Sequence, residues 1–124
     1  MNNSIKKIIN FKNTYASLPE IFYQSIEPSP VKDPKLIILN RKLGKELGID
    51  MKQNDKYYTD IFSGNSIPIG ASPIAQRYVG HQFGNFVPQL GDGRAILLGE
   101  VITANRSRFD IQLKGSGKTE FSRG

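Results

Sequence analysis

The sequence contains no cysteine, has a single histidine and carries no long apolar run. Without cysteine the chain can have no disulfide framework, no thiolate metal site and no cysteine nucleophile. This absence is typical of a reducing compartment, because disulfides persist mainly in oxidising ones. The longest apolar stretches, such as Leu36–Leu39 and Ala95–Leu98, are far shorter than the ~20 residues that a membrane-spanning helix needs.

The start of the sequence, MNNSIKKIINFKN, does not resemble a signal peptide. This stretch holds lysines but neither an extended apolar segment nor a small-residue cleavage site. With the absence of cysteine, it predicts a soluble, cytoplasmic protein that does not associate with a membrane.

Seventeen Lys and Arg outnumber eleven Asp and Glu, which gives a net charge of +6. Such a balance indicates either a phosphate-rich partner, a nucleotide or a nucleic acid, or only a solvated surface. The positive residues are scattered, without a block of like charge or a basic helix with interleaved aromatic residues. This scatter argues against a dedicated nucleic-acid binder and leaves a nucleotide partner and a solvated surface as alternatives.

Three short helices are predicted in the first half, two of them from capping residues. Ser17 and Pro19 favour a helix that begins near Leu18–Tyr23. Asn40–Leu47 has a capping residue at its start, a leucine every fourth residue and Gly48 as a stop signal. A third helix is expected over Asp55–Phe62.

The second half is predicted to contain one more helix and a β-hairpin. Ser72 can cap a helix with Pro73 at its first position and Ile74–Val79 in its body. Two strands are expected over Arg94–Ile102 and Arg108–Lys114, joined by a five-residue connection. The pattern predicts an α+β fold, and since no closing element follows the hairpin we expect an incomplete domain.

Gly91-Asp92-Gly93-Arg94, directly ahead of the first hairpin strand, is one candidate site. Glycines let successive backbone N–H groups face one anion, and an adjacent guanidinium adds donors. The same residues also fit a plain β-turn, with glycine supplying positive φ.

Lys114, the last residue on the polar face of the second strand, is the other. A strand fixes a lysine stem well enough to direct its ammonium at a phosphate, as the strand lysine of protein kinases does. An exposed lysine on a solvated face is the alternative. His81 fits either a general base or a packed turn, and we favour the structural role.

Several motifs in one order resemble the selenoprotein O (YdiU) family of protein adenylyltransferases, and the resemblance spans nearly the whole chain. The matching segments are Asn13-Thr14-Tyr15, Ser63-Gly64-Asn65, Gly70–Gln76, Gly80–Gly84, Pro88–Ala95, Leu98-Gly99-Glu100 and Asp110–Gly117. Members of this family are much longer, so the resemblance identifies the chain as an amino-terminal fragment.

The resemblance implies the amino-terminal part of a protein-kinase-like (pseudokinase) fold. It implies an enzyme that transfers AMP from ATP, or UMP from UTP, to Ser, Thr or Tyr hydroxyls of proteins, with Mg²⁺ or Mn²⁺ in the full-length relative. By this likeness Gly91, Gly93 and Arg94 contact the nucleotide and Lys114 holds its phosphates. The catalytic aspartate and the metal ligands are expected beyond Gly124.

Two units follow from these patterns: an amino-terminal helical extension over residues 1–62 and a partial nucleotide-binding lobe over residues 63–124. Without the catalytic and metal-binding residues the fragment alone is expected to be inactive. The alternative function is a non-catalytic remnant or interaction module with at most weak nucleotide binding.

Overall fold

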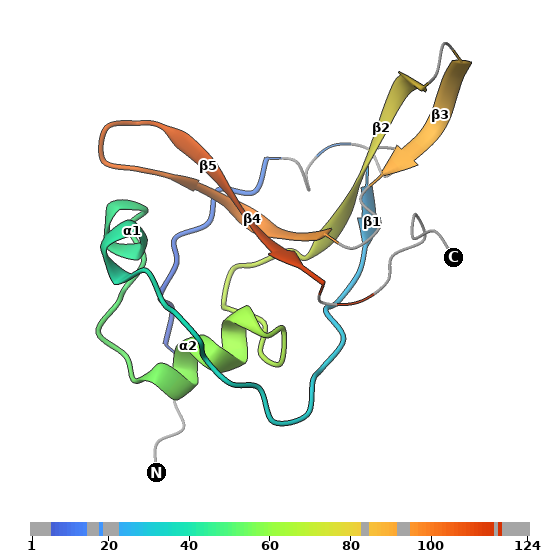
Figure 1. Ribbon diagram of the computed structural model, residues 1–124. Coiled ribbons are helices and arrows are strands. Elements are labelled where there is room, and N and C mark those ends of the chain that lie inside the picture. The colour runs from blue at the N-terminus through green and yellow to red at the C-terminus, as the bar shows by residue number, and fades with distance from the viewer. Residues whose placement is uncertain are drawn as a thin grey trace.

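The computed structural model describes residues 6–14, 18, 23–82, 85–91, 95–115 and 117, with residues 77–82 and 85–91 described by their backbone alone. Two short helices lie together beside an antiparallel sheet (Figure 1). The elements are β1 (Tyr23–Ser25), α1 (Arg41–Glu46), α2 (Asp55–Phe62), β2 (Ile74–Gln82), β3 (Asn85–Gly91), β4 (Ala95–Ile102) and β5 (Arg108–Lys114). The predicted α+β class is confirmed.

The five strands form one antiparallel sheet in the order β1-β2-β4-β5, with β3 paired to β2. The long strand β2 has two sets of neighbours. Its first residues, Ile74–Gln76, pair with β1, and Ile74 also pairs with Leu97 of β4. From Arg77 onward β2 pairs with β3, so the β2–β3 hairpin extends beyond the main sheet, as the yellow and orange strands in Figure 1 show.

The two helices predicted in the middle of the chain are confirmed, and both have a side-chain cap, of which only Asn40 was predicted. The Asn40 side chain accepts a hydrogen bond from the backbone N–H of Leu43, and Gly48 adopts a φ of +82° just after α1. The Asn54 side chain accepts from the N–H of Tyr57 at the start of α2. These caps satisfy N–H groups that have no partner within the helix.

The predicted hairpin is confirmed as β4 and β5. The pairing begins next to the turn, where Ile102 faces Arg108, and ends where Ala95 faces Lys114. A β-bulge interrupts the register, because Leu97 faces Gln112 whereas Gly99 faces Ile111. Six consecutive residues of β4 are buried, Ile96–Val101, so this strand is covered on both faces. A mostly apolar run, here interrupted by Glu100, is typical of a strand in that position.

The core lies between the two helices, β4 and the amino-terminal segment. Its buried members are Ile8, Ile9, Ile49, Tyr58, Ile61 and Val101. The Tyr58 hydroxyl donates to the carbonyl of Asp50 at 2.6 Å, which satisfies a fully buried polar group. The backbone N–H of Lys12 donates to the carbonyl of Glu100 at 2.7 Å and ties the amino-terminal segment to β4. The core thus contains residues from both predicted units, 1–62 and 63–124. The division of the chain into these two units stays a prediction.

The helix predicted from Ser72 through Val79 is wrong, because this segment begins β2. Local capping signals favoured a helix, but pairing with β1, β3 and β4 supplies the backbone with partners. Burial supports the strand too, since Ile74 and Ala75 are 2% and 0% exposed. Tertiary pairing therefore overrides a local preference.

The helix predicted near Leu18–Tyr23 lies mostly outside the described residues. Its last residue, Tyr23, is the first residue of β1 and pairs with Gln76, so the predicted end is wrong. Arg94, the predicted start of the first hairpin strand, also lies outside the described part, and β4 begins at Ala95. In the described part of the chain, no helix is long and apolar enough to cross a membrane.

Candidate functional site

Lys114 ends β5 with its side chain exposed, as the alternating pattern predicts. Its cross-strand partner is Ala95, the residue directly after the predicted Gly91–Arg94 turn. Two positions further back, Gln112 is also exposed, and its Nε2 donates to Oε1 of Gln76 at 3.3 Å. The strand therefore presents polar side chains at the end of the sheet where Lys114 lies.

Gly91 is the last residue of β3 and pairs with Arg77. Gly93 and Arg94 lie outside the described residues, and their proposed contacts stay predictions. Three residues separate Gly91 from Ala95, and such a connection spans at most about 14 Å. Gly91 is therefore tethered to the same end of the sheet as Lys114.

A glycine-containing loop follows Lys114. Gly115 and Gly117 have φ values of +76° and +138°, a region that residues with a side chain rarely adopt. A hypothetical Cβ at Gly117 would lie 2.6 Å from Oγ of Ser29, whereas one at Gly115 would meet nothing within 4 Å. The loop thus turns sharply and approaches a segment far away in the sequence.

His81 lies in β2, paired with Phe86 of β3, and its side chain is outside the described part. The structural role favoured for it from the sequence stays a prediction. Among the described residues, no cluster of three His, Asp or Glu side chains could hold a metal ion. No step through a metal is therefore assigned to the described residues.

A buried carboxylate cluster was missed from the sequence. Glu100 is 5% exposed within β4, and its Oε2 accepts from the Thr14 hydroxyl and from Nη1 of Arg108, both at 2.5 Å. The backbone N–H of Glu100 also donates to Oδ1 of Asn13 at 3.3 Å. Charge-assisted hydrogen bonds of this kind offset the cost of burying a carboxylate.

This cluster fastens the amino-terminal segment to the hairpin. Two signals could have revealed it: an acidic residue inside an apolar strand, and the two motifs Asn13-Thr14-Tyr15 and Leu98-Gly99-Glu100. The pairing itself joins residues 86 positions apart, which no local pattern indicates. Because Glu100 is enclosed by its partners, we assign it a structural rather than a catalytic role.

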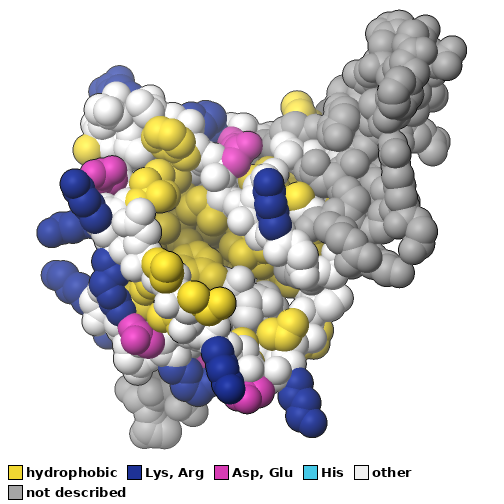
Figure 2. Space-filling view, viewed as in Figure 1, with side chains coloured by type: hydrophobic (Ala, Val, Ile, Leu, Met, Phe, Trp, Pro, Cys, Tyr) yellow, Lys and Arg dark blue, Asp and Glu magenta, His cyan; other side chains and the backbone are white. Residues whose placement is uncertain are grey.

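An apolar hollow lies apart from Lys114, between α1 and the turn of the β4–β5 hairpin. It encloses about 660 Å³, and its lining includes Leu43, Leu47, Thr103 and Phe109. Figure 2 shows apolar side chains gathered in a hollow on this face, with charged side chains around it. Its lining contains no Lys or Arg, so it is not suited to binding phosphate.

Comparison with known proteins decides the family. The chain matches the family described as "Protein adenylyltransferase SelO" over residues 6–124. This chain belongs to the SelO family. The resemblance inferred from its motifs is confirmed.

Its relatives named "Protein nucleotidyltransferase YdiU" are similar over nearly the whole chain. The protein from Maridesulfovibrio salexigens is 51% identical over 99% of this chain and 25% of its own length. Those from Agrobacterium fabrum and Rhodopseudomonas palustris are 59% and 60% identical, over 94% and 91% of this chain and 24% and 23% of their own lengths. The chain thus spans about a quarter of the relatives that it matches.

Proposed function

We propose that this chain is the nucleotide-binding, amino-terminal part of a protein nucleotidyltransferase. The complete enzyme transfers AMP from ATP, or UMP from UTP, to Ser, Thr or Tyr hydroxyls of other proteins. In this reaction the hydroxyl oxygen gives up its proton to a base and bonds to the α-phosphorus, while the bond from that phosphorus to the bridging oxygen breaks and pyrophosphate leaves with the electron pair. The family membership and the names of the relatives support the reaction class.

One observation carries the proposal for this part of the chain. The register of β4 and β5 sets Lys114 opposite Ala95, the residue next to the Gly91–Arg94 segment. A lysine ammonium and glycine N–H groups at one end of a sheet are suited to a triphosphate, since both donate to anionic oxygens. We assign Gly91, Gly93, Arg94 and Lys114 to nucleotide binding on this basis.

The remaining parts of the proposal come from the family resemblance. They are a protein-kinase-like fold for the complete enzyme, a cytoplasmic location, and a catalytic aspartate and Mg²⁺ or Mn²⁺ ligands in the downstream sequence of the relatives. Phosphoryl and nucleotidyl chemistry depends on charge neutralisation by metal and by cationic side chains. The protein targets must carry an accessible hydroxyl, and nucleic acid is not a partner.

The test uses a protein that carries this chain together with the downstream sequence of its relatives. Incubation with α-labelled ATP is expected to label protein substrates, whereas γ-labelled ATP leaves them unlabelled. Lys114→Ala should reduce labelling strongly without changing the circular dichroism spectrum. Labelling from the γ-position would contradict nucleotidyl transfer, and undiminished labelling by the variant would contradict the role of Lys114.

The second candidate is a non-catalytic interaction module. Its basis is that the chain spans only about a quarter of the length of the relatives that it matches. Purified 124-residue chain should then bind nucleotide weakly and transfer none. Metal-dependent labelling by this chain alone would rule out the module.

A further inference from the structure

The segment Ile26–Val31, here called the strap, has no regular secondary structure but is fixed at both ends. The backbone N–H of Ile26 donates to the carbonyl of Pro73 at 3.1 Å. At the other end, the Val31 N–H donates to Oδ1 of Asn65 at 2.6 Å, and Nδ2 of Asn65 donates to the Val31 carbonyl at 2.9 Å. The middle of the strap therefore cannot shift far unless one of these bonds breaks.

Ser29, in the middle of the strap, lies directly against Gly117. A Cβ at position 117 would be 2.6 Å from the Oγ of Ser29, 3.2 Å from its Cβ and 3.3 Å from its backbone nitrogen. Contacts under 3.0 Å require something to shift, so only glycine fits at 117 in this arrangement. The trace in Figure 1 follows this approach, with the strap passing from β1 beside the chain that leaves β5.

The contact bears on Lys114 because Gly117 is three residues further along the chain. Sheet pairing ends at Lys114, so the sheet no longer fixes the backbone beyond it. The four-carbon stem of a lysine is flexible. Its ammonium is therefore well positioned only where the backbone around the residue is firmly fixed. The strap is the described segment that meets the loop on the far side of Lys114.

We propose that the strap is a positioning element, which holds the loop after Lys114 through the Ser29–Gly117 contact and so directs the Lys114 ammonium toward nucleotide phosphates. This role rests on the proposed nucleotide binding. It also gives a function to Asn65, from the motif Ser63-Gly64-Asn65, since its two hydrogen bonds anchor the strap. Ser29 and Asn65 are thus positioning residues that do not touch the nucleotide themselves.

The test is a double-mutant cycle at positions 29 and 117, measured as the Kd of the purified chain for ATP and UTP by NMR titration. Gly117→Ala is expected to raise Kd about threefold or more, a coupling of the size seen between residues in contact. Adding Ser29→Gly removes Oγ and Cβ, and should recover the part of that loss that the contact causes, whereas the strain of a side chain at φ +138° remains. Ser29→Ala keeps the Cβ at 3.2 Å and should recover less.

Gly115→Ala is the matched control, because it introduces strain at a positive φ without meeting any atom within 4 Å. Ser29→Gly should not rescue it. Asn65→Ala, which frees the strap at Val31, should raise Kd as Gly117→Ala does. The backbone amide shift of Lys114 should move in Gly117→Ala and return in the double variant, whether or not nucleotide is present.

The outcomes separate this role from the proposed function. If Lys114→Ala weakens binding but positions 29 and 117 act additively, the strap has no positioning role and nucleotide binding stands. In a second outcome, the Lys114 amide shift moves in Gly117→Ala and returns in the double variant, but the chain binds no nucleotide. The Ser29–Gly117 contact then exists, but nucleotide binding and the positioning role of the strap are both overturned.

Discussion

Gly99 is a residue whose missing side chain the packing requires. A Cβ there would overlap the ring of Phe11 and the Oδ1 of Asn13, both in the segment that covers β4. We expect Gly99→Ala to lower the free energy of unfolding by about 1–3 kcal/mol, as overpacking does. Urea unfolding measures this loss. A loss below about 0.5 kcal/mol would contradict the close packing.

Asp50 makes the stability depend on pH. The backbone N–H of Lys52 and the Nε2 of Gln53 donate to its carboxylate at 2.9 and 3.1 Å, and these hydrogen bonds lower its pKa below the ordinary 3.8. A lowered folded-state pKa means that the charged form stabilises the fold above pH 3.8 and that this stability is lost as pH falls through the folded pKa.

The substitution Asp50→Asn tests this link, since it keeps the shape and removes the titration. Wild type should have the higher Tm at pH 6, and the difference from Asp50→Asn should shrink below pH 3.8. A difference that stays constant across this range would show that the hydrogen bonds do not depend on the charge.

The ion pair between buried Glu100 and exposed Arg108 shows why some contacts of single residues escape sequence analysis. Lys114 could be predicted, because a strand's alternation sets which residues face solvent and its last position is visible in the pattern. Glu100 could not, because its partners Thr14 and Arg108 are brought to it only by the fold. Ser29 was missed for the same reason, since its contact is with a glycine 88 positions away in the sequence.

Among the elements, α2 depends on its cap. The Asn54 side chain accepts from the N–H of Tyr57 at 3.0 Å, and the helix carries the buried residues Tyr58 and Ile61. We expect Asn54→Ala to lower the free energy of unfolding by about 1 kcal/mol. Thermal unfolding checks this, with Asn54→Asp as a control that keeps an acceptor. Equal losses in both variants would show that the cap is not the cause.

Sequence analysis predicted the elements that depend on local signals, namely α1, α2 and the β4–β5 hairpin. It did not predict β2, which depends on pairing with distant strands. Both α1 and α2 have side-chain caps, and the β4–β5 hairpin has a short connection between two β-rich runs. Ser72-Pro73, directly before β2, resembles a helix start, yet the strand form of β2 depends on partners 49 to 53 residues before it and 23 residues after it in the sequence. Local patterns do not contain this information.

At the scale of the whole molecule, burial separates residues that hold the fold from those that only cover it. Ile9 is 1% exposed in the core, whereas Ile37 is 92% exposed. Ile9→Ala should cost about 2–4 kcal/mol of unfolding free energy, and Ile37→Ser less than about 0.5 kcal/mol. Chemical denaturation compares the two. Similar losses would mean that Ile37 is buried in solution.

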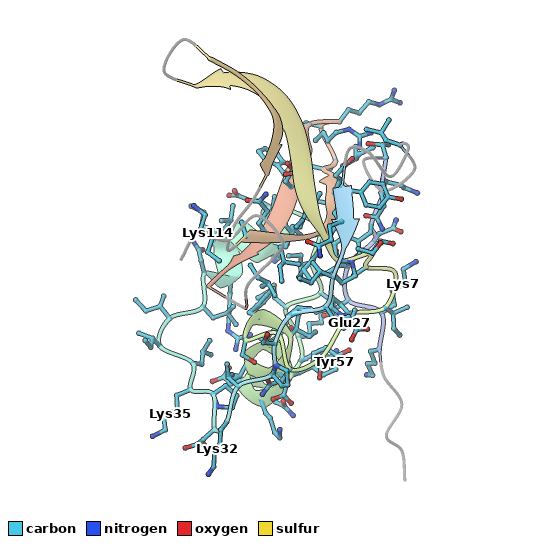
Figure 3. The ribbon with its side chains drawn as sticks, turned by 90° about the vertical axis from the view of Figure 1, so that its right-hand side faces the viewer. Lys7, Glu27, Lys32, Lys35, Tyr57 and Lys114 are labelled. Atoms are coloured by element: carbon cyan, nitrogen blue, oxygen red, sulfur yellow. The ribbon has the colours of Figure 1, made fainter. Side chains whose placement is uncertain are left out.

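The charge distribution around the molecule supplies the control for the central claim. Figure 3 shows Lys114 and Lys7 on opposite sides of the molecule. Both side chains are exposed. Replacing either lysine removes one positive charge from a surface of net charge +6, so only a specific site distinguishes the two.

The most direct measurement is the affinity of the purified chain for ATP and UTP, compared among wild type, Lys114→Ala and Lys7→Ala by NMR titration. A charge-assisted hydrogen bond to phosphate predicts that Lys114→Ala raises Kd about tenfold or more and that Lys7→Ala leaves it within about twofold. Shifts should concentrate at Gly91 and Lys114. Equal effects of the two substitutions, or nucleotide binding that leaves these residues undisturbed, would contradict a nucleotide site at this end of the sheet.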